Sequence, residues 1–558
     1  MQKIYLKLRN NIVLDSDLQL AEREINHLFE ECKPIYLGEV ATYNAIPQKH
    51  LLSNSRADGI IGYWVSGNLI SISKVVHYLS FIQEIWSHEA IVDSVYSTKV
   101  DGWYCTIPLM AMSEILFFVK EPSKQSLIKI VEELSSGTDS NKDITQAIHR
   151  MKTSAPHVHS FHTYKAKFFP RFVRSLIISN SDLRNEHPTI CDPFVGSGTT
   201  LIESALMGFN SIGIDVDALS CFISSVKCDS LHIDTRKSDG NISQISAKGK
   251  NQYTFPIEIV KKFQRWDKLD EMAEYQEEIS SILNKIDQLD VPNRDLLKIS
   301  LSDALTRKFN VRMMGTGSGR FALEIGKTSL SSLIQSDLKN VKKSIATIDV
   351  LKNSYDLSIA RPVVVNGNAV KRDIPDNSVD MIITSPPYIP ASSGREDYLV
   401  GKLTSMKAMG LYDESAFGTC SQNSVGSMAA QSDDLEGLPS SVSDLYNWLI
   451  NDDLRSIKAR PIIAYYKSIK AALQEDKRTI KDEGKIIYII GKETVFYNSA
   501  TKAVLYRVAC DKIFTEIAES IGLRVEEVID IELDKRDNIA RPRGTDKYYE
   551  CAIIMTRV

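Results

Sequence analysis

Hydrophobic residues recur along the chain in two patterns, as short continuous runs and as longer stretches with helical spacing. A largely hydrophobic run at residues 379–383 predicts a buried strand, and the runs at 484–491 and 549–555 predict two more. Residues 201–207 have the composition of a helix that ends at Gly208. Strands and helices in this arrangement indicate an α/β fold with a doubly wound sheet.

Two regions depart from this pattern. The first begins with a predicted strand at residues 4–8 and an amphipathic helix at 18–31. The second is strongly charged, with apolar residues at helical spacing, and predicts a mostly helical insertion. We therefore expect four regions: an α+β N-terminal domain (1–148), two halves of one α/β domain (149–227 and 359–558), and the insertion between them (228–358).

Composition narrows the class of protein only a little. The 558 residues are 43% hydrophobic and 25% charged, as in ordinary globular proteins. No run of about 18 apolar residues and no apolar signal core occur, so we expect a cytoplasmic protein without a membrane span. The eight cysteines form no Cys-x-x-Cys pair, which favours reduced thiols over a zinc site or a disulfide framework.

The net charge of −4 means that any contact with nucleic acid must come from local basic patches. Residues 149–174 carry lysines, arginines and histidines with no acid between them, and residues 535–544 form a basic loop with Pro and Gly. The first segment is either a solvated charged face or a segment that contacts phosphate or closes over a cofactor. The second is either a solvated loop or one that reaches a nucleic-acid backbone or lines the target pocket, and the charge pattern leaves these readings open.

The predicted strand at 379–383 ends in a turn that carries polar chemistry, Thr384-Ser385-Pro386-Pro387-Tyr388. Two consecutive prolines force a rigid turn. Ligands of a doubly wound sheet bind outside the carboxyl ends of its strands. The turn therefore presents a hydroxyl, main-chain carbonyls and an aromatic ring to a crevice, unless it is only a structural turn. Methylation of an exocyclic amine on a flipped base requires such acceptors and such a ring.

A glycine-rich turn follows a predicted strand at 188–191. Gly196 and Gly198 let the backbone approach a ligand closely. A second predicted strand, at 211–215, ends in Asp215, and an acid at this place binds the ribose of a nucleotide-like cofactor. The glycine spacing is not G-x-G-x-x-G, which argues against a dinucleotide.

The glycine turn at 192–200 and the proline turn at 384–388 together resemble those of the amino-methylating, S-adenosylmethionine-dependent DNA methyltransferases. The Ser-Pro-Pro-Tyr form is most similar to enzymes that act on N4 of cytosine. Residues 160–174 resemble the segment that closes over the methionine end of the cofactor, and residues 365–380 resemble the strand and turn before the catalytic strand. The resemblance implies a Rossmann-like seven-stranded sheet with an antiparallel pair at its edge.

The resemblance also implies roles for individual residues. Ser385 and the carbonyl of Pro386 would hold the amine protons, Tyr388 would stack on the flipped base, and the methyl group would transfer in line without a metal. Asp215 would bind the ribose and Asn368 would contact the adenine. The expected catalytic residues are Ser385, Pro386, Pro387 and Tyr388, and the expected cofactor-binding residues are Lys167, Phe169, Asp192, Pro193, Phe194, Gly196, Ser197, Gly198, Thr199, Asp215 and Asn368.

Other functions stay open at this point. The N-terminal strand and helix resemble the start of THUMP-containing tRNA guanine-N2 methyltransferases, which usually carry Asp or Asn where this chain has Ser385. Enzymes that methylate N6 of adenine in DNA also usually carry Asp or Asn at the position of Ser385. A non-catalytic nucleic-acid-binding subunit is a further alternative. If the protein is a DNA methyltransferase, we expect its partners to be DNA and cognate restriction or defence proteins. The N-terminal domain would then be accessory or bind nucleic acid. The insertion would serve target recognition or form a structural cap.

Overall fold

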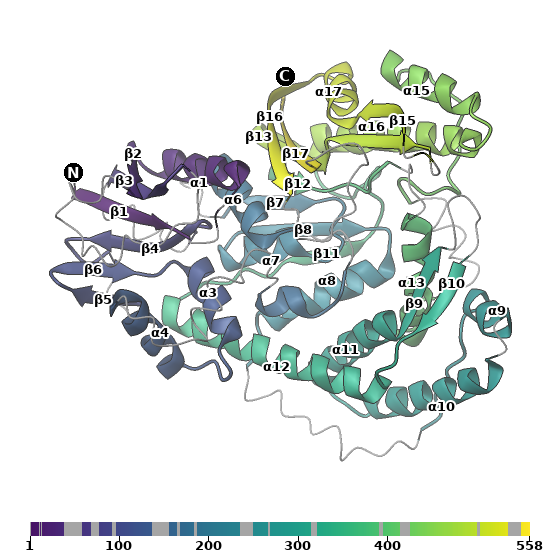
Figure 1. Ribbon diagram of the computed structural model, residues 1–558, viewed down its shortest axis with the longest axis horizontal. Coiled ribbons are helices and arrows are strands. Elements are labelled where there is room, and N and C mark those ends of the chain that lie inside the picture. The colour runs from purple at the N-terminus through teal and green to yellow at the C-terminus, as the bar shows by residue number, and fades with distance from the viewer. Residues whose placement is uncertain are drawn as a thin grey trace.

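The computed structural model describes residues 2–9, 12, 14–37, 58–67, 78–91, 96–136, 156–164, 168–182, 187–234, 249–265, 268–313, 321–389, 394–412, 424–498, 501, 503–533 and 548–558. Figure 1 shows a central sheet with an N-terminal sheet on one side of it and a group of long helices below. None of the helices in these ranges is long and apolar enough to cross a membrane.

Within the described residues the central sheet has seven strands, in the order β11-β8-β7-β12-β13-β17-β16. The first five are parallel, whereas β17 runs antiparallel to both of its neighbours. The predicted α/β fold with a seven-stranded sheet and an antiparallel edge pair is therefore confirmed. The strands are β7 (Thr189–Asp192), β8 (Asn210–Asp215), β11 (Val363–Asn366), β12 (Val379–Thr384), β13 (Ile480–Gly491), β16 (Leu523–Leu533) and β17 (Tyr548–Arg557).

The strand order reverses between β7 and β12, because the chain builds outward from β7 through β8 to β11 and then returns to add β12 on the other side. At such a switch point the connections leave in opposite directions and open a crevice at the carboxyl ends of the strands. The glycine turn follows β7 and the proline turn follows β12. The topology therefore brings the two turns to one edge of the sheet.

Hydrophobic side chains cover both faces of the central sheet. Ile383 packs with α1 (Asp15–Leu28) and α6 (Pro170–Asn180), whereas Ile382 packs on the opposite face with α16 (Ala459–Thr479). Strands buried on both faces read as continuous hydrophobic runs, which explains why β12 was recognisable in the sequence. The other helices of the α/β domain are α7 (Thr199–Leu206), α8 (Ala218–Ser230), α13 (Gly394–Ala408), α15 (Ser440–Ile450) and α17 (Cys510–Ser520).

The N-terminal sheet is antiparallel throughout, in the order β2-β3-β1-β4-β6-β5. Its apolar face shares one core with the central sheet, since Ile4 and Leu6 belong to the same cluster as Ile177 and Ile554. The boundary predicted at residue 148 lies outside the described residues. The elements are β1 (Gln2–Leu8), β2 (Glu31–Tyr36), β3 (Ile60–Gly67), β4 (Ile82–Ser87), β5 (Ser97–Val100), β6 (Trp103–Thr106), α3 (Leu109–Phe118) and α4 (Lys124–Ser136).

In its described residues, the segment between α8 and β11 contains the helices α9 to α12, and it also contains a hairpin that the helical pattern did not predict. Phe309, the first residue of that hairpin, packs among Phe255, Phe263 and Tyr275. The packing of Phe309 in this aromatic cluster thus stabilises the start of the hairpin, directly after the preceding helix ends. The elements are α9 (Ile257–Arg265), α10 (Leu269–Ile286), α11 (Asn293–Lys308), β9 (Phe309–Met313), β10 (Phe321–Ile325) and α12 (Leu330–Tyr355).

The chain breaks between two helices near residue 452. α15 ends at Ile450, and the Asp452 carboxylate accepts hydrogen bonds from the main-chain amides of Leu454 and Arg455 before α16 begins. Gly394 is the first residue of α13. A second hairpin, β14 (Glu493–Tyr497) with β15 (Val504–Ala509), follows β13.

Candidate active site

The turn between β7 and α7 depends on its two glycines. Gly196 has φ +50° and Gly198 has φ +82°, which side chains of L-residues rarely adopt. A Cβ atom on Gly196 would lie 3.3 Å from the Tyr164 hydroxyl, and one on Gly198 would lie 3.1 Å from the Ser224 Oγ. Tyr164 and Ser224 therefore pack closely against the turn, and a larger residue at either glycine would strain its path.

Asp215 lies at the carboxyl end of β8, directly beside this turn. Its Oδ2 accepts a hydrogen bond from the Gly196 amide at 3.0 Å, and its Oδ1 accepts one from the Asp217 amide at 2.9 Å. Burial, together with the nearby Asp217 charge, raises the pKa of Asp215 to about 6. Each carboxylate oxygen has a second lone pair. Asp215 can thus hold the turn in place and still accept a hydroxyl from a ligand.

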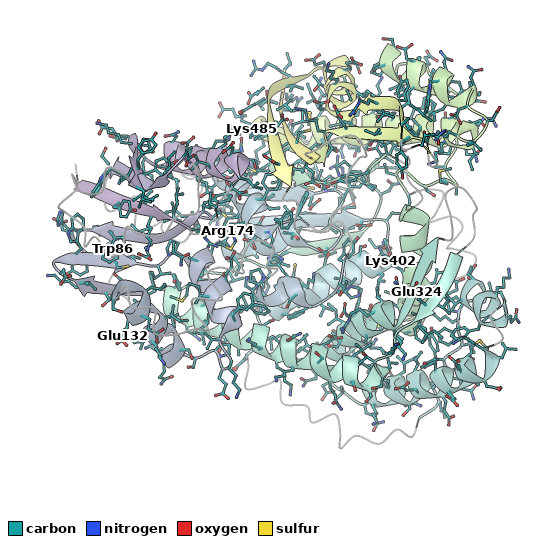
Figure 2. The ribbon with its side chains drawn as sticks, in the orientation of Figure 1. Trp86, Glu132, Arg174, Glu324, Lys402 and Lys485 are labelled. Atoms are coloured by element: carbon teal, nitrogen blue, oxygen red, sulfur yellow. The ribbon has the colours of Figure 1, made fainter. Side chains whose placement is uncertain are left out.

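A buried ion pair between Lys402 and Asp217 lies close to the glycine turn. The Lys402 ammonium, on α13, pairs with the Asp217 carboxylate, which also accepts the Leu219 amide at the start of α8. The same ammonium lies 5.1 Å from the centre of the Tyr164 ring. Figure 2 labels Lys402 beside the central sheet. The helix that follows the proline turn is thereby joined to the helix that borders the glycine turn. Sequence reasoning did not identify Lys402, since its partner is 185 residues away.

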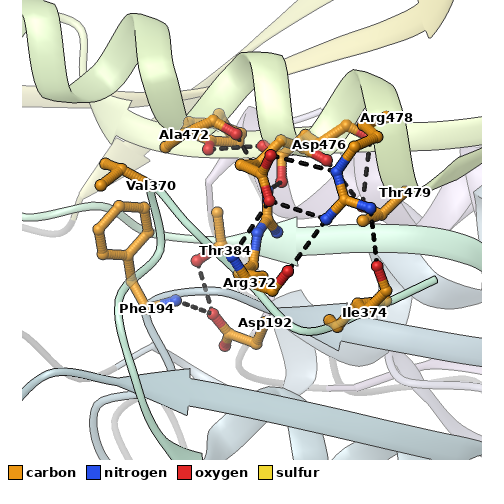
Figure 3. Close-up of polar contacts among 12 residues, drawn as sticks. Asp192, Phe194, Val370, Arg372, Ile374, Thr384, Ala472, Asp476, Arg478 and Thr479 are labelled. Carbon is orange, nitrogen blue, oxygen red and sulfur yellow. Dashed lines mark hydrogen bonds and ion pairs between the residues drawn. The ribbon is translucent and has the colours of Figure 1, made fainter. Parts of the chain in front are cut away.

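Asp192 connects the two predicted motifs directly. Its Oδ1 accepts a hydrogen bond from the Phe194 amide at 3.1 Å and another from the Thr384 hydroxyl at 2.5 Å (Figure 3). Thr384 ends β12 and Asp192 ends β7, and these strands are neighbours in the sheet. One carboxylate therefore fixes the glycine turn and the base of the proline turn relative to each other.

Burial raises the pKa of Asp192 to about 6, above its ordinary value of 3.8. The stability that this group contributes is therefore fully present below about pH 4 and is lost as the pH rises through about 6. Asp192→Asn keeps an acceptor oxygen but does not ionise. We expect this variant to gain up to about 3 kcal/mol in unfolding free energy, relative to wild type, between pH 4 and pH 7.5. Urea unfolding of both proteins at the two pH values measures this difference, and an equal pH response in both would contradict it.

The proline turn is partly open to solvent. Ser385 and Pro387 are half-buried, Pro386 is buried, and Tyr388 is 37% exposed. The Tyr388 hydroxyl donates to the Glu550 carboxylate of β17. The turn therefore leaves Ser385 and Tyr388 partly accessible at the sheet edge.

A buried polar network lies next to the contact between Asp192 and Thr384 (Figure 3). The Arg372 guanidinium pairs with the Asp476 carboxylate at 2.6 Å, with both side chains fully buried, and the Tyr488 hydroxyl donates to the same carboxylate at 2.7 Å. Arg478 donates to the Ile374 carbonyl at 2.8 Å. Hydrogen bonds of this kind stabilise a buried charge pair and join α16 to the segment before β12.

The structure places the other predicted residues as follows. Asn368 follows β11, and its Oδ1 accepts the Val370 amide at 3.1 Å, so this amide oxygen helps to form its own turn. Phe169 packs against the apolar cluster shared by the N-terminal sheet and α6. Lys167 lies outside the described residues. Pro193, Phe194, Ser197 and Thr199 belong to the glycine turn or begin α7.

The basic segment at 149–174 is, in its described part, largely internal. Arg174, labelled in Figure 2, pairs with Glu203 at 2.7 Å, and His159 contacts the other oxygen of the same carboxylate at 2.7 Å. All three side chains are buried. The reading of this segment as a solvated face or phosphate contact is wrong for Arg174 and His159, because both are buried and contact Glu203 of α7. The basic loop at 535–544 lies outside the described residues.

The central sheet has seven strands, one of them antiparallel, with a glycine turn after β7 and Asp215 at the end of β8. These features together define a Rossmann-like methyltransferase fold. A family model described as DNA methylase, of the N6 and N4 type, matches residues 80–224. This match agrees with the resemblance of the glycine turn and the proline turn to those of the amino-methylating DNA methyltransferases. Similarity to this family implies S-adenosylmethionine as the methyl donor.

Three relatives carry the name Type II methyltransferase. M.MjaII of Methanocaldococcus jannaschii is 41% identical over 86 residues, which cover 15% of this chain and 16% of the relative. M.MvaI of Kocuria varians is 21% identical over 60% of this chain and 77% of its own length. M.BsoBI of Geobacillus stearothermophilus is 27% identical over 41% of this chain and 49% of its own. The chain thus spans less than half the length of two of these relatives.

The residues at the switch point fit the implied cofactor. The glycine turn carries no side chain at Gly196 and Gly198, and Asp215 carries acceptor oxygens beside it. A ribose offers hydroxyl donors to such a carboxylate. When bound there, the cofactor would supply an electrophilic methyl group on sulfur.

Proposed function

We propose that this protein transfers a methyl group to an exocyclic amine of a base in DNA, and that the amine is N4 of cytosine. The observation that carries the proposal is the hydrogen bond from Thr384 to Asp192. It joins the turn that would hold the base to the turn that would hold the cofactor. Ser385 in place of Asp or Asn favours cytosine over adenine.

The chemistry requires little from the protein except positioning. The lone pair of a cytosine N4 amine is delocalised into the ring, which makes the amine a weak nucleophile. The Ser385 hydroxyl and the Pro386 carbonyl would accept its two protons and favour a more pyramidal nitrogen. Tyr388 would stack on the base after it leaves the duplex. Holding the amine in line with the methyl group then supplies much of the rate acceleration.

N6 of adenine is the second candidate target, because the matching family model includes both N6- and N4-methylating enzymes. The two amines are chemically alike, and the same pair of acceptors would serve either. We also propose that the protein acts beside a cognate restriction enzyme, since its relatives are Type II methyltransferases.

Methyl transfer with nucleoside mass spectrometry tests the proposal. The full chain is incubated with methyl-labelled S-adenosylmethionine and either amplified genomic DNA, which carries no modification, or bulk tRNA. We expect N4-methylcytosine in DNA. N6-methyladenine would keep the enzyme class and change the base, whereas N2-methylguanosine in tRNA would overturn the DNA proposal. No label in either substrate, with the cofactor still bound, would overturn the enzyme activity.

A further inference from the structure

Glu550 lies at the same edge of the central sheet as the proline turn. It pairs in register with Gly491 of β13 and with Ile531 of β16. Because β17 is antiparallel, its first residues lie beside the carboxyl end of β13. Glu550 and Tyr388 are 162 residues apart in sequence and meet only through this sheet order.

The Glu550 carboxylate accepts the hydrogen bond of the Tyr388 hydroxyl. Burial raises the pKa of Glu550, and the bond from Tyr388 opposes that rise by stabilising the charged form. Its two neighbours in the ladder, Gly491 and Ile531, have no polar side chain to offer. Glu550 is half-buried, and a carboxylate removed from water is unfavourable without hydrogen-bond donors, one of which is the Tyr388 hydroxyl.

We propose that Glu550 is a positioning residue that fixes the plane of the Tyr388 ring for stacking on the target base. This inference rests on the proposed function. The prolines make the main chain rigid, but they leave the side-chain torsions of Tyr388 free. The ring remains 37% exposed while its hydroxyl is held. A ring whose orientation is set before the base arrives loses less conformational freedom on binding.

Removal of Glu550 should therefore weaken binding of the target without weakening binding of the cofactor. Ordering one side chain corresponds to roughly a tenfold change in affinity. We expect Glu550→Ala and Tyr388→Phe each to raise the KM for DNA about tenfold. Since both changes break the same hydrogen bond, the double variant should be no worse than either single one. Glu550→Gln keeps an acceptor oxygen and should restore most of the loss.

The measurement is a double-mutant cycle on KM and kcat with amplified genomic DNA, with S-adenosylhomocysteine affinity measured by calorimetry for every variant. Glu526→Ala is the matched control, because Glu526 is an exposed glutamate on β16 whose carboxylate pairs with Lys485. Additive effects, or a loss of cofactor affinity in Glu550→Ala and Glu550→Gln alike, would overturn the positioning role. An inactive wild-type protein would instead overturn the proposed function on which it rests.

Discussion

Replacing Ser385 with alanine is expected to lower kcat for methyl transfer about 100-fold, which is the cost of misplacing a reacting group by roughly 1 Å. The Ser385 hydroxyl is half-buried at the end of β12, and the residue before it is held by Asp192. Alanine removes one of the two acceptors that would orient the amine. The main-chain path of the turn should not change, because the prolines set it.

The assay for Ser385→Ala is labelled methyl transfer to DNA, with S-adenosylhomocysteine binding measured on the same preparation. Cofactor affinity should stay at the wild-type level, since Asp192 and the glycine turn are untouched. Ser378→Ala is the matched control: its hydroxyl donates to the Pro375 carbonyl at the other end of the strand, and activity should be retained. Full turnover by Ser385→Ala would remove Ser385 from the catalytic set.

Local chemistry made the two turns predictable from the sequence. Gly196 and Gly198 are required by positive φ, and Pro386 and Pro387 restrict the backbone by their own rings. The strands before the turns are buried on both faces, so their hydrophobic runs stand out. These features depend on residues that are close in sequence, so the local sequence pattern predicts them.

The contacts that assemble the site were not predictable in the same way. Thr384 and Asp192 are 192 residues apart, and Lys402 and Asp217 are 185 residues apart. Their meeting depends on strand order, which no local pattern contains. The basic segment shows the same limit, because charge along the chain does not reveal that Glu203 reaches Arg174 in the interior.

Asp215→Ala is expected to lower the affinity for S-adenosylhomocysteine by at least about 100-fold. The carboxylate holds the amides of Gly196 and Asp217, and the variant leaves both without this acceptor. Each buried unsatisfied amide costs about 1–3 kcal/mol, which is enough to release the glycine turn from its folded path. The variant also removes the acceptor that we expect to bind the cofactor ribose, so the two losses act on the same site.

Calorimetry with S-adenosylhomocysteine measures this loss, and circular dichroism establishes that the rest of the protein remains folded. Asp215→Asn tests a partial loss of the carboxylate, because its single carbonyl oxygen can accept only one of the two amides. We expect its affinity to lie between those of wild type and Asp215→Ala. Asp270→Ala, an exposed acid on α10, is the matched control and should bind as wild type does. Unchanged affinity in Asp215→Ala would place the ribose elsewhere and would reduce Asp215 to a residue that only shapes the turn.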